Sequence, residues 1–296
     1  MIDENSTKDE VLKAVRQFAW ALYYASVELQ ADRDVVMTAV KQNGHALEYV
    51  SEELKADREV VLEAVRQDGN ALQYASPKLR ADRDVVLEAV KNCGVALKFA
   101  SDKIKNDKEV VLVATSEDPY ALQFADNKFR DDKEIVLQSV KQDGYVLKYA
   151  SDKIRDDEEV VLEAVRRDGA SLLFSSSRFK CDKKVVLEAV REDGFALEFA
   201  SDKIRDDKEV VLEAVRENGV SLEFASDKLK NDKEVVLEAI EIDSWAAYYS
   251  PELLKNDSEV FLKAISIRSD TITPFSTDSI RIRKKFNLLS NENKRR

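Results

Sequence analysis

Glycine and proline are scarce in this chain, and their scarcity limits the folds that it can adopt. The 296 residues contain only 7 Gly and 4 Pro, whereas average usage would give roughly 12% for the two together. β-Sandwiches, barrels and dinucleotide-binding sheets use these residues in their many turns. The composition therefore argues against all three, while 44% hydrophobic residues leave enough apolar material for a core.

Histidine and cysteine are also nearly missing. His45 is the single histidine, and Cys93 and Cys181 are the two cysteines. Proton-transfer sites, catalytic triads and zinc centres commonly need such residues in a defined constellation. No Gly-rich phosphate loop and no common catalytic motif occurs either. We therefore predict a protein that is not an enzyme, with no catalytic residue, no bound metal and no cofactor.

Long hydrophobic runs are the third absence. No apolar stretch approaches the ~18 residues of a membrane helix, and the first ten residues are too polar for a usual secretory signal. The net charge is −11, and an acidic body repels phosphate backbones. We expect a cytoplasmic monomer without a membrane span, which contacts nucleic acid only if its C-terminal tail does so.

What the chain does contain is a strict repeat. A phrase close to D-K-E-V-V-L-E-A-V recurs, and its first Asp stands at positions 32, 57, 82, 107, 132, 157, 182, 207, 232 and 257. One step earlier the phrase begins with Thr7 instead of Asp. The chain therefore holds eleven units of 25 residues, without insertion or deletion, and the last degenerates after about Ile267.

One unit is expected to form two helices. Asp57 is a good N-cap, and residues 60–65 give an apolar stripe too wide for a helix that is covered from one side only. Gly69 is predicted to end this helix in the left-handed conformation. A shorter second helix follows at residues 71–75, and a further turn points Leu79 inward.

An aromatic residue recurs in the second helix, and we call these positions the aromatic column. We interpret the column as a core spine between units, since it contains both Tyr and Phe and the hydroxyl group is therefore optional. Its members are Tyr24, Tyr49, Tyr74, Phe99, Phe124, Tyr149, Phe174, Phe199, Phe224 and Tyr249.

The position after the glycine varies far more than its neighbours, and we call it the stripe. Asn, Ala and Trp cannot share one core environment without cavities or overpacking, so the stripe is expected to be partly exposed. Aromatic residues there are of the type that anchors protein interfaces; drift without function is the alternative. The candidate partner-binding residues are Trp20, His45, Tyr120, Tyr145, Phe195 and Trp245.

The C-terminal sixteen residues carry a basic cluster within an otherwise acidic chain. Three interpretations stay open: a tail that pairs with the acidic body, a nuclear-import signal, or a tether to an anionic surface. A nuclear location is therefore the alternative to a cytoplasmic one. The candidate contacts are Arg281, Arg283, Lys284, Lys285, Lys294, Arg295 and Arg296.

The consensus D-[KR]-[DE]-V-V-L-E-A-V-[KR]-x-[DN]-G-x-A-L-x-[FY]-A-S resembles a family of short helical repeats known only as a domain of unknown function. Similar repeats occur in protists, large DNA viruses and intracellular bacteria. The resemblance covers residues 7 to about 267 and implies a helical-repeat fold, without implying an activity or a ligand. Pro119 departs from it by replacing the glycine of the fifth unit, and we expect a local irregularity there because proline cannot be left-handed.

These observations predict an all-α fold, a right-handed solenoid of tandem 25-residue helix–turn–helix repeats. It should span residues 1–270, followed by a capping segment and basic tail at 271–296. The predicted function is that of a scaffold that binds a protein or peptide, with a host-directed effector or inhibitor as a special case. The alternative is a nucleic-acid-associated protein that acts through its basic tail, with the solenoid as a spacer.

Overall fold

The protein is a tandem helical-repeat solenoid. A computed structural model of the chain describes residues 2–255 and 257–267. Within these residues each unit begins with a long helix, and the long helices are α1 (Lys8–Val15), α3 (Arg33–Gln42), α5 (Arg58–Gln67), α6 (Arg83–Asn92), α8 (Lys108–Glu117), α10 (Lys133–Val140), α11 (Glu158–Arg167), α13 (Lys183–Glu192), α15 (Lys208–Glu217), α17 (Lys233–Ile242) and α19 (Ser258–Ile267). The predicted segment 271–296 lies outside the described residues.

The second element of each of the first ten units is a six-residue 3₁₀ helix, at the place where the sequence predicted a shorter second helix. These helices are η1 (Ala19–Tyr24), η2 (Gly44–Tyr49), η3 (Gly69–Tyr74), η5 (Gly94–Phe99), η6 (Pro119–Phe124), η7 (Gly144–Tyr149), η9 (Gly169–Phe174), η10 (Gly194–Phe199), η11 (Gly219–Phe224) and η12 (Ser244–Tyr249). Each has i→i+3 hydrogen bonds, such as the bond from the Ala71 amide to the Asp68 carbonyl.

The further turn is a third short helix, which makes the unit a three-helix structure. In most units it is a single α-helical turn, whereas η4 and η8 take the 3₁₀ form. The short helices are α2 (Val27–Gln30), α4 (Glu52–Lys55), η4 (Leu79–Ala81), α7 (Asp102–Lys105), α9 (Asn127–Arg130), η8 (Ile154–Asp156), α12 (Ser177–Lys180), α14 (Asp202–Arg205), α16 (Asp227–Lys230) and α18 (Glu252–Lys255).

The long helices carry the core. Asp57 caps α5 as predicted, with one carboxylate oxygen accepting from the amides of Glu59 and Val60 at 2.9 and 3.1 Å. Residues Val60, Val61, Ala64 and Val65 of that helix are fully buried. The same four positions are buried in the neighbouring units, so each long helix is covered from both sides, as the wide apolar stripe predicts.

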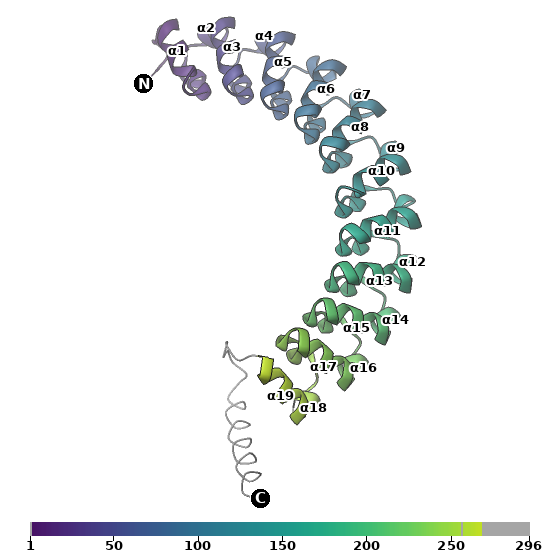
Figure 1. Ribbon diagram of the computed structural model, residues 1–296. Coiled ribbons are helices and arrows are strands. Elements are labelled where there is room, and N and C mark those ends of the chain that lie inside the picture. Colours follow the sequence, from purple (N-terminus) through teal and green to yellow (C-terminus); the bar gives the residue numbers. More distant parts are fainter. Residues whose placement is uncertain (1, 256, 268–296) are drawn as a thin grey trace, which may run out of the picture.

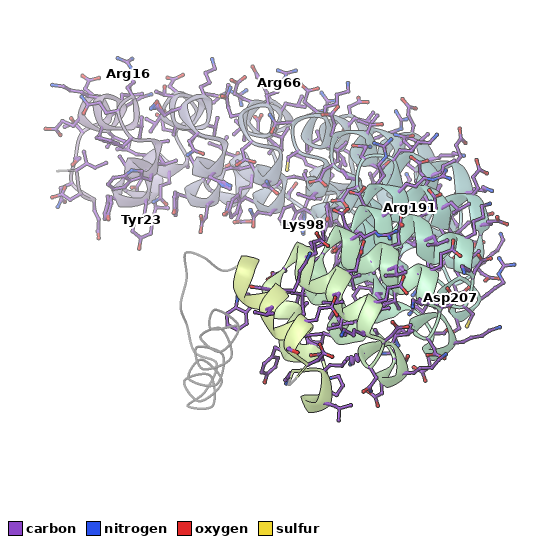
Figure 2. The ribbon with its side chains drawn as sticks, turned by 60° about the horizontal axis from the view of Figure 1, so that its bottom comes forward. Arg16, Tyr23, Arg66, Lys98, Arg191 and Asp207 are labelled. Carbon is purple, nitrogen blue, oxygen red and sulfur yellow. The ribbon has the colours of Figure 1, made fainter. Side chains whose placement is uncertain are left out.

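The units stack into a crescent (Figure 1). Short helices such as α12, α14 and α16 lie along its convex edge, outside α13, α15 and α17. Tyr23 of η1 and Lys98 of η5 lie on the inner side of the curve, whereas Asp207 lies at the outer edge (Figure 2). The 3₁₀ helices thus form the concave row of the solenoid.

The glycines serve a different purpose from the predicted one. Among the described residues no glycine has a positive φ angle, so the expected left-handed C′ conformation is wrong. A Cβ atom added to any of the seven glycines would lie 2.2–2.4 Å from the carbonyl oxygen of the residue 20 positions later, an alanine of the next long helix. The glycine therefore permits close approach of one unit to the backbone of the next.

Pro119 replaces the glycine of the fifth unit, and it disturbs the helices on either side of it less than expected. Helix α8 keeps its ten residues, and Pro119 begins η6 without breaking it. Pro119 is half-buried, whereas each glycine in this column is buried, and α10 of the following unit ends two residues earlier than its neighbours. The irregularity thus lies at the junction that faces the proline ring.

Ion pairs and backbone hydrogen bonds join consecutive units. Lys133 of α10 pairs with the cap Asp157 of the next unit at 2.9 Å and with Glu159 at 2.8 Å. The same two-carboxylate arrangement recurs from Lys8 to Lys233, except in the unit where Glu158 replaces the basic residue. From Ser51 to Ser226, the residue before each short-helix turn also donates its amide to the previous short helix, as Ser101 does to the Arg80 carbonyl at 2.9 Å.

Polar features mark the N-terminal unit. Thr7 and Glu10 form a capping box on α1, in which the Thr7 amide donates to the Glu10 carboxylate at 2.8 Å. Glu10 is the residue that stands where later units have Val or Ile.

In the part of the chain that the structure describes, the helices are all too short or too polar to cross a bilayer.

Candidate binding surface

The stripe is the second residue of each 3₁₀ helix, and the structure places it on the concave row. The side chains of Trp20, Tyr145, Phe195 and Trp245 are 36–57% exposed. His45 and Tyr120 are half-buried. The six candidate residues therefore share one row, but they lie one to several units apart and do not converge on one spot.

The backbone under the stripe is held in the same way in eight of the ten units. In these units the residue two positions earlier is an Asp or Asn whose side chain accepts from the stripe residue's amide; the exceptions are Phe18 before Trp20 and Cys93 before Val95. The distance from the Asp Oδ1 atom to the backbone amide nitrogen is 2.8 Å for Asp118 and Tyr120, 2.9 Å for Asp143 and Tyr145, and 2.8 Å for Asp243 and Trp245. A variable side chain is thus presented from a fixed backbone.

Stripe side chains also reach into the next unit. The Tyr120 hydroxyl donates to the Asp143 carboxylate at 2.7 Å, and this hydrogen bond raises the pKa of Tyr120 to about 12. The His45 Nε2 atom lies 3.0 Å from Asp68. His45 and Tyr120 thus make a polar contact with the next unit, whereas the contacts of Tyr145 and Phe195 with the next unit are between aromatic rings.

The aromatic column is not the core spine that we predicted. Its residues are half-buried, and Tyr24 is 48% exposed. They pack at the edge of the Val–Ala–Leu core, where each can contact the stripe residue of the unit before. Ring centroids lie 4.8 Å apart for Tyr145 and Phe174, and 6.0 Å apart for Phe195 and Phe224, both edge-on.

Stripe and aromatic column together make a half-exposed aromatic surface along the concave row. Lysines of the 3₁₀ helices lie over these rings: the Lys98 ammonium is 4.5 Å from the Phe99 centroid, and Lys148 is 4.5 Å from Tyr145. Sequence periodicity identified both columns, but their lateral contact between units was missed.

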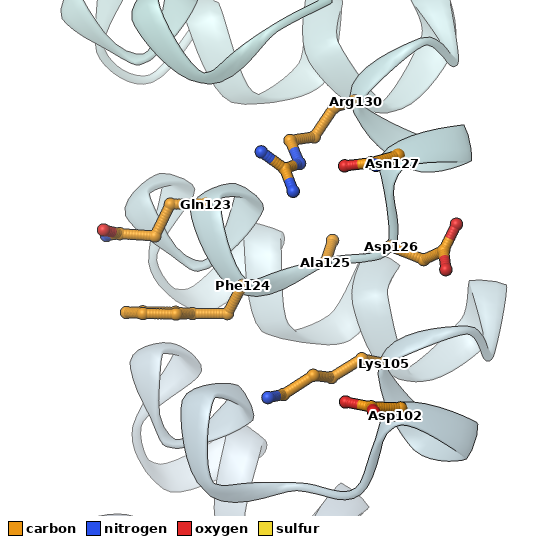
Figure 3. A pocket seen from close by; sticks show the side chains of 8 residues that line it. All are labelled: Asp102, Lys105, Gln123, Phe124, Ala125, Asp126, Asn127 and Arg130. Carbon is orange, nitrogen blue, oxygen red and sulfur yellow. The ribbon is translucent and has the colours of Figure 1, made fainter.

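A recess of about 370 Å³ opens beside this surface in units four and five. It lies between η6 and the short helices α7 and α9. Figure 3 shows Gln123 and Phe124 pointing away from α9, while Lys105 and Arg130 extend from the short helices toward the 3₁₀ row. Asp102, Ala125, Asp126 and Asn127 complete the lining.

Other candidate chemistry is limited in the described residues. They contain no cluster of three His, Cys, Asp or Glu side chains able to hold a metal ion. Cys93 is half-buried and Cys181 is exposed, and both are free thiols. The basic-tail candidates from Arg281 to Arg296 lie outside the part of the chain that the structure describes.

Comparison with known proteins places the chain in a family of repeats. The model of a family described as "Domain of unknown function (DUF4116)" matches residues 7–55, 32–80, 57–105, 82–130, 107–155, 132–180, 157–205, 182–230, 207–255 and 232–281. Each match takes in two successive units, and their starts confirm the 25-residue register that begins at Thr7. No curated protein and no solved structure matches the chain.

Proposed function

This chain belongs to the DUF4116 family, and we propose that it is a non-enzymatic scaffold whose concave row binds a protein or peptide partner. One observation carries the proposal: a partly exposed, variable and aromatic-rich stripe is presented from a backbone that an Asp or Asn side chain anchors in the same way in eight of the ten units. A rigid frame with interchangeable contact residues is how helical-repeat proteins bind partners. Preorganised aromatic side chains are the usual anchors of such interfaces.

Affinity capture from the native cells tests this function. The bait is the full chain, compared with a Tyr145→Ala/Phe195→Ala variant, and partners are quantified by mass spectrometry. We expect one partner to be lost from the variant by about tenfold or more, because each truncated ring removes an interface anchor. Circular dichroism should show that both proteins keep the same helix content.

The matched control removes apolar side chains from the opposite side of the units. Val27 and Leu253 lie on short helices and are 74% and 83% exposed. The variant Val27→Ala/Leu253→Ala should retain the partner. Retention by the stripe variant, or equal loss by both variants, would refute the concave row as the binding surface.

The basic tail supplies a competing function, binding to nucleic acid. That alternative predicts a salt-sensitive affinity for DNA or RNA that disappears when residues 281–296 are deleted. The scaffold proposal predicts that the deletion leaves partner capture unchanged.

A further inference from the structure

A row of basic residues runs along the solenoid between the 3₁₀ helices and the short helices. It borders the recess of units four and five, and we call the strip between these two rows of helices the groove. We call the row of basic residues the basic column; it occupies the last position of the α-helical short turns and the equivalent position in η4 and η8. Nine successive units have Lys or Arg there, and all nine side chains are half-buried. The column consists of Lys55, Arg80, Lys105, Arg130, Arg155, Lys180, Arg205, Lys230 and Lys255.

Five members of the basic column differ from the other basic rows in lacking a carboxylate partner. Lysines and arginines at the start of the long helices each contact carboxylates of the next unit, and Arg166, Arg191 and Arg216 pair with Glu one unit on. Within residues 2–255 and 257–267, Arg80, Lys105, Arg130, Lys180 and Lys230 form no ion pair. Their positive charge is therefore available to a ligand.

The central units concentrate this charge. The short helices of Arg80, Arg130 and Lys180 have Pro77, Asn127 and Ser177 three residues earlier, where other units place an acid. The Nε atoms of Arg80 and Arg130 are buried and have no hydrogen-bond partner in the described structure. A buried guanidinium nitrogen without an acceptor favours the arrival of one.

The facing 3₁₀ helices add to the pattern. The position before the aromatic column is Gln73, Lys98, Gln123, Lys148 and Leu173 in units three to seven, and it is Glu48, Glu198 and Glu223 in flanking units. The groove is thus basic or neutral in the middle and more acidic toward both ends. The recess with Lys105, Arg130 and Phe124 lies in this middle section (Figure 3).

We infer that this groove binds an acidic peptide in the polyproline II conformation, with one Asp or Glu presented to each unit. A polyproline II helix has three residues per turn and advances ~9.3 Å per turn, and packed helical units are ~8–10 Å apart. Every third side chain of such a peptide faces the same way, so its carboxylates match the spacing of the basic column. The half-exposed aromatic rings beside the column are the kind of surface on which proline rings pack.

The surrounding charge favours a peptide over a nucleic acid. Asp102 and Asp126 line the same recess, and the chain has a net charge of −11. A polymer with a phosphate on every residue would place charges against these carboxylates. A peptide with one carboxylate in three residues avoids them.

Fluorescence anisotropy with the full chain tests this inference, which rests on the scaffold function proposed above. The probe is a labelled 15-residue peptide of five Glu-Pro-Pro repeats. The reference peptides are five Gln-Pro-Pro repeats and a peptide of identical composition with its five Glu residues contiguous. We expect the first peptide to bind about tenfold more tightly than both others, and to weaken as salt rises.

Matched triple variants locate the site. Arg80→Gln/Lys105→Gln/Arg130→Gln should lower the affinity about tenfold, because the three groove charges are removed. Lys78→Gln/Lys103→Gln/Lys128→Gln removes the same charge from exposed positions two residues earlier and should change affinity less than about twofold. If the first variant does not fold, Lys105→Gln against Lys103→Gln gives the same comparison.

Four results would overturn the inference. Three are equal binding of the contiguous-Glu peptide, equal loss in the two triple variants, and tighter binding of a 15-nucleotide single-stranded RNA that displaces the peptide; the fourth is failure of the peptide to bind. If the peptide fails to bind while a partner is still captured through Tyr145 and Phe195, the acidic-peptide inference falls and the scaffold function stands. If only the capture experiment fails, the scaffold function is refuted.

Discussion

At the scale of single residues, the seven glycines let consecutive units approach closely, because each faces a main-chain carbonyl oxygen of the next long helix. The position was evident from sequence because all seven glycines share one phase of the repeat. A glycine after a helix is usually read as a left-handed cap, and no local signal distinguishes this role from close packing. The carbonyl oxygen that excludes a Cβ atom belongs to an alanine 20 residues later, which becomes a neighbour only in the folded stack.

Gly169→Ala tests this packing role. The new Cβ would lie 2.4 Å from the Ala189 carbonyl oxygen, so the two units must separate. We expect the free energy of unfolding to fall by about 1–3 kcal/mol, as for other overpacked sites. Urea denaturation followed by circular dichroism measures the change.

Ser244→Ala is the matched control for this substitution. Ser244 occupies the same column and is buried, but it already has a Cβ atom. Its replacement should change stability by less than the Gly169 variant does. Equal effects would mean that the glycine column has no special packing role.

At the scale of elements, sequence predicted the long helices well and the second helix only in part. The long helix has a capping Asp, a wide apolar stripe and ten residues, and these three features together indicate an α-helix. The second element has six residues, and apolar positions such as Ala71, Leu72, Tyr74 and Ala75 fit a period of 3.0 as well as one of 3.6. Its 3₁₀ form, and the half-exposed position of its aromatic residue, depend on packing against the next unit.

The junction between units seven and eight contains an ion pair of reversed sign. Elsewhere a basic residue at the start of one long helix contacts an acid 26 residues later, as Lys133 contacts Glu159. Here Glu158 stands in the basic position and Lys184 in the acidic one, and the two charges lie 3.5 Å apart. The spatial pairing is thus retained while both residue types are exchanged.

Exchanging the two charges tests this pairing. Lys184→Glu should lower the thermal midpoint, since it sets two carboxylates against each other. Glu158→Lys/Lys184→Glu restores the usual arrangement, and the lysine introduced by the first substitution would also reach Asp182, as its counterparts reach their cap residues. We therefore expect the double variant to melt at or above the temperature of the original chain; a double variant less stable than Lys184→Glu would contradict the pairing.

At the scale of the whole molecule, the repeated ion pairs make the protein lose stability as the pH falls. The hydrogen bond from Arg83 holds the pKa of Asp107 below its ordinary value, and the hydrogen bond from Lys8 does the same for the pKa of Asp32. A carboxylate with a lowered pKa in the folded state stabilises the fold above its unfolded pKa of about 4, and this contribution is lost as pH falls through the folded pKa.

We therefore expect the thermal midpoint to be nearly constant from about pH 5 to 8 and to fall below about pH 4. Asp107→Asn should reduce this acid sensitivity, because asparagine keeps the N-cap but cannot lose a charge. Asp182→Asn is the control, since the usual Lys or Arg that would pair with Asp182 is replaced by Glu158. The two variants should differ in thermal melts recorded at pH 3 and pH 7; identical pH profiles would exclude the ion pair as the cause.

The junctions between units have a consequence for how such a chain can change its length. Glycine faces a main-chain carbonyl, and short helices are joined by amide-to-carbonyl bonds, so much of each junction is independent of side-chain identity. Duplication or loss of one whole 25-residue unit by recombination would give every remaining unit the same kind of neighbour on both sides. The crescent can thus be lengthened or shortened in whole steps, while residues on its concave row are free to diversify.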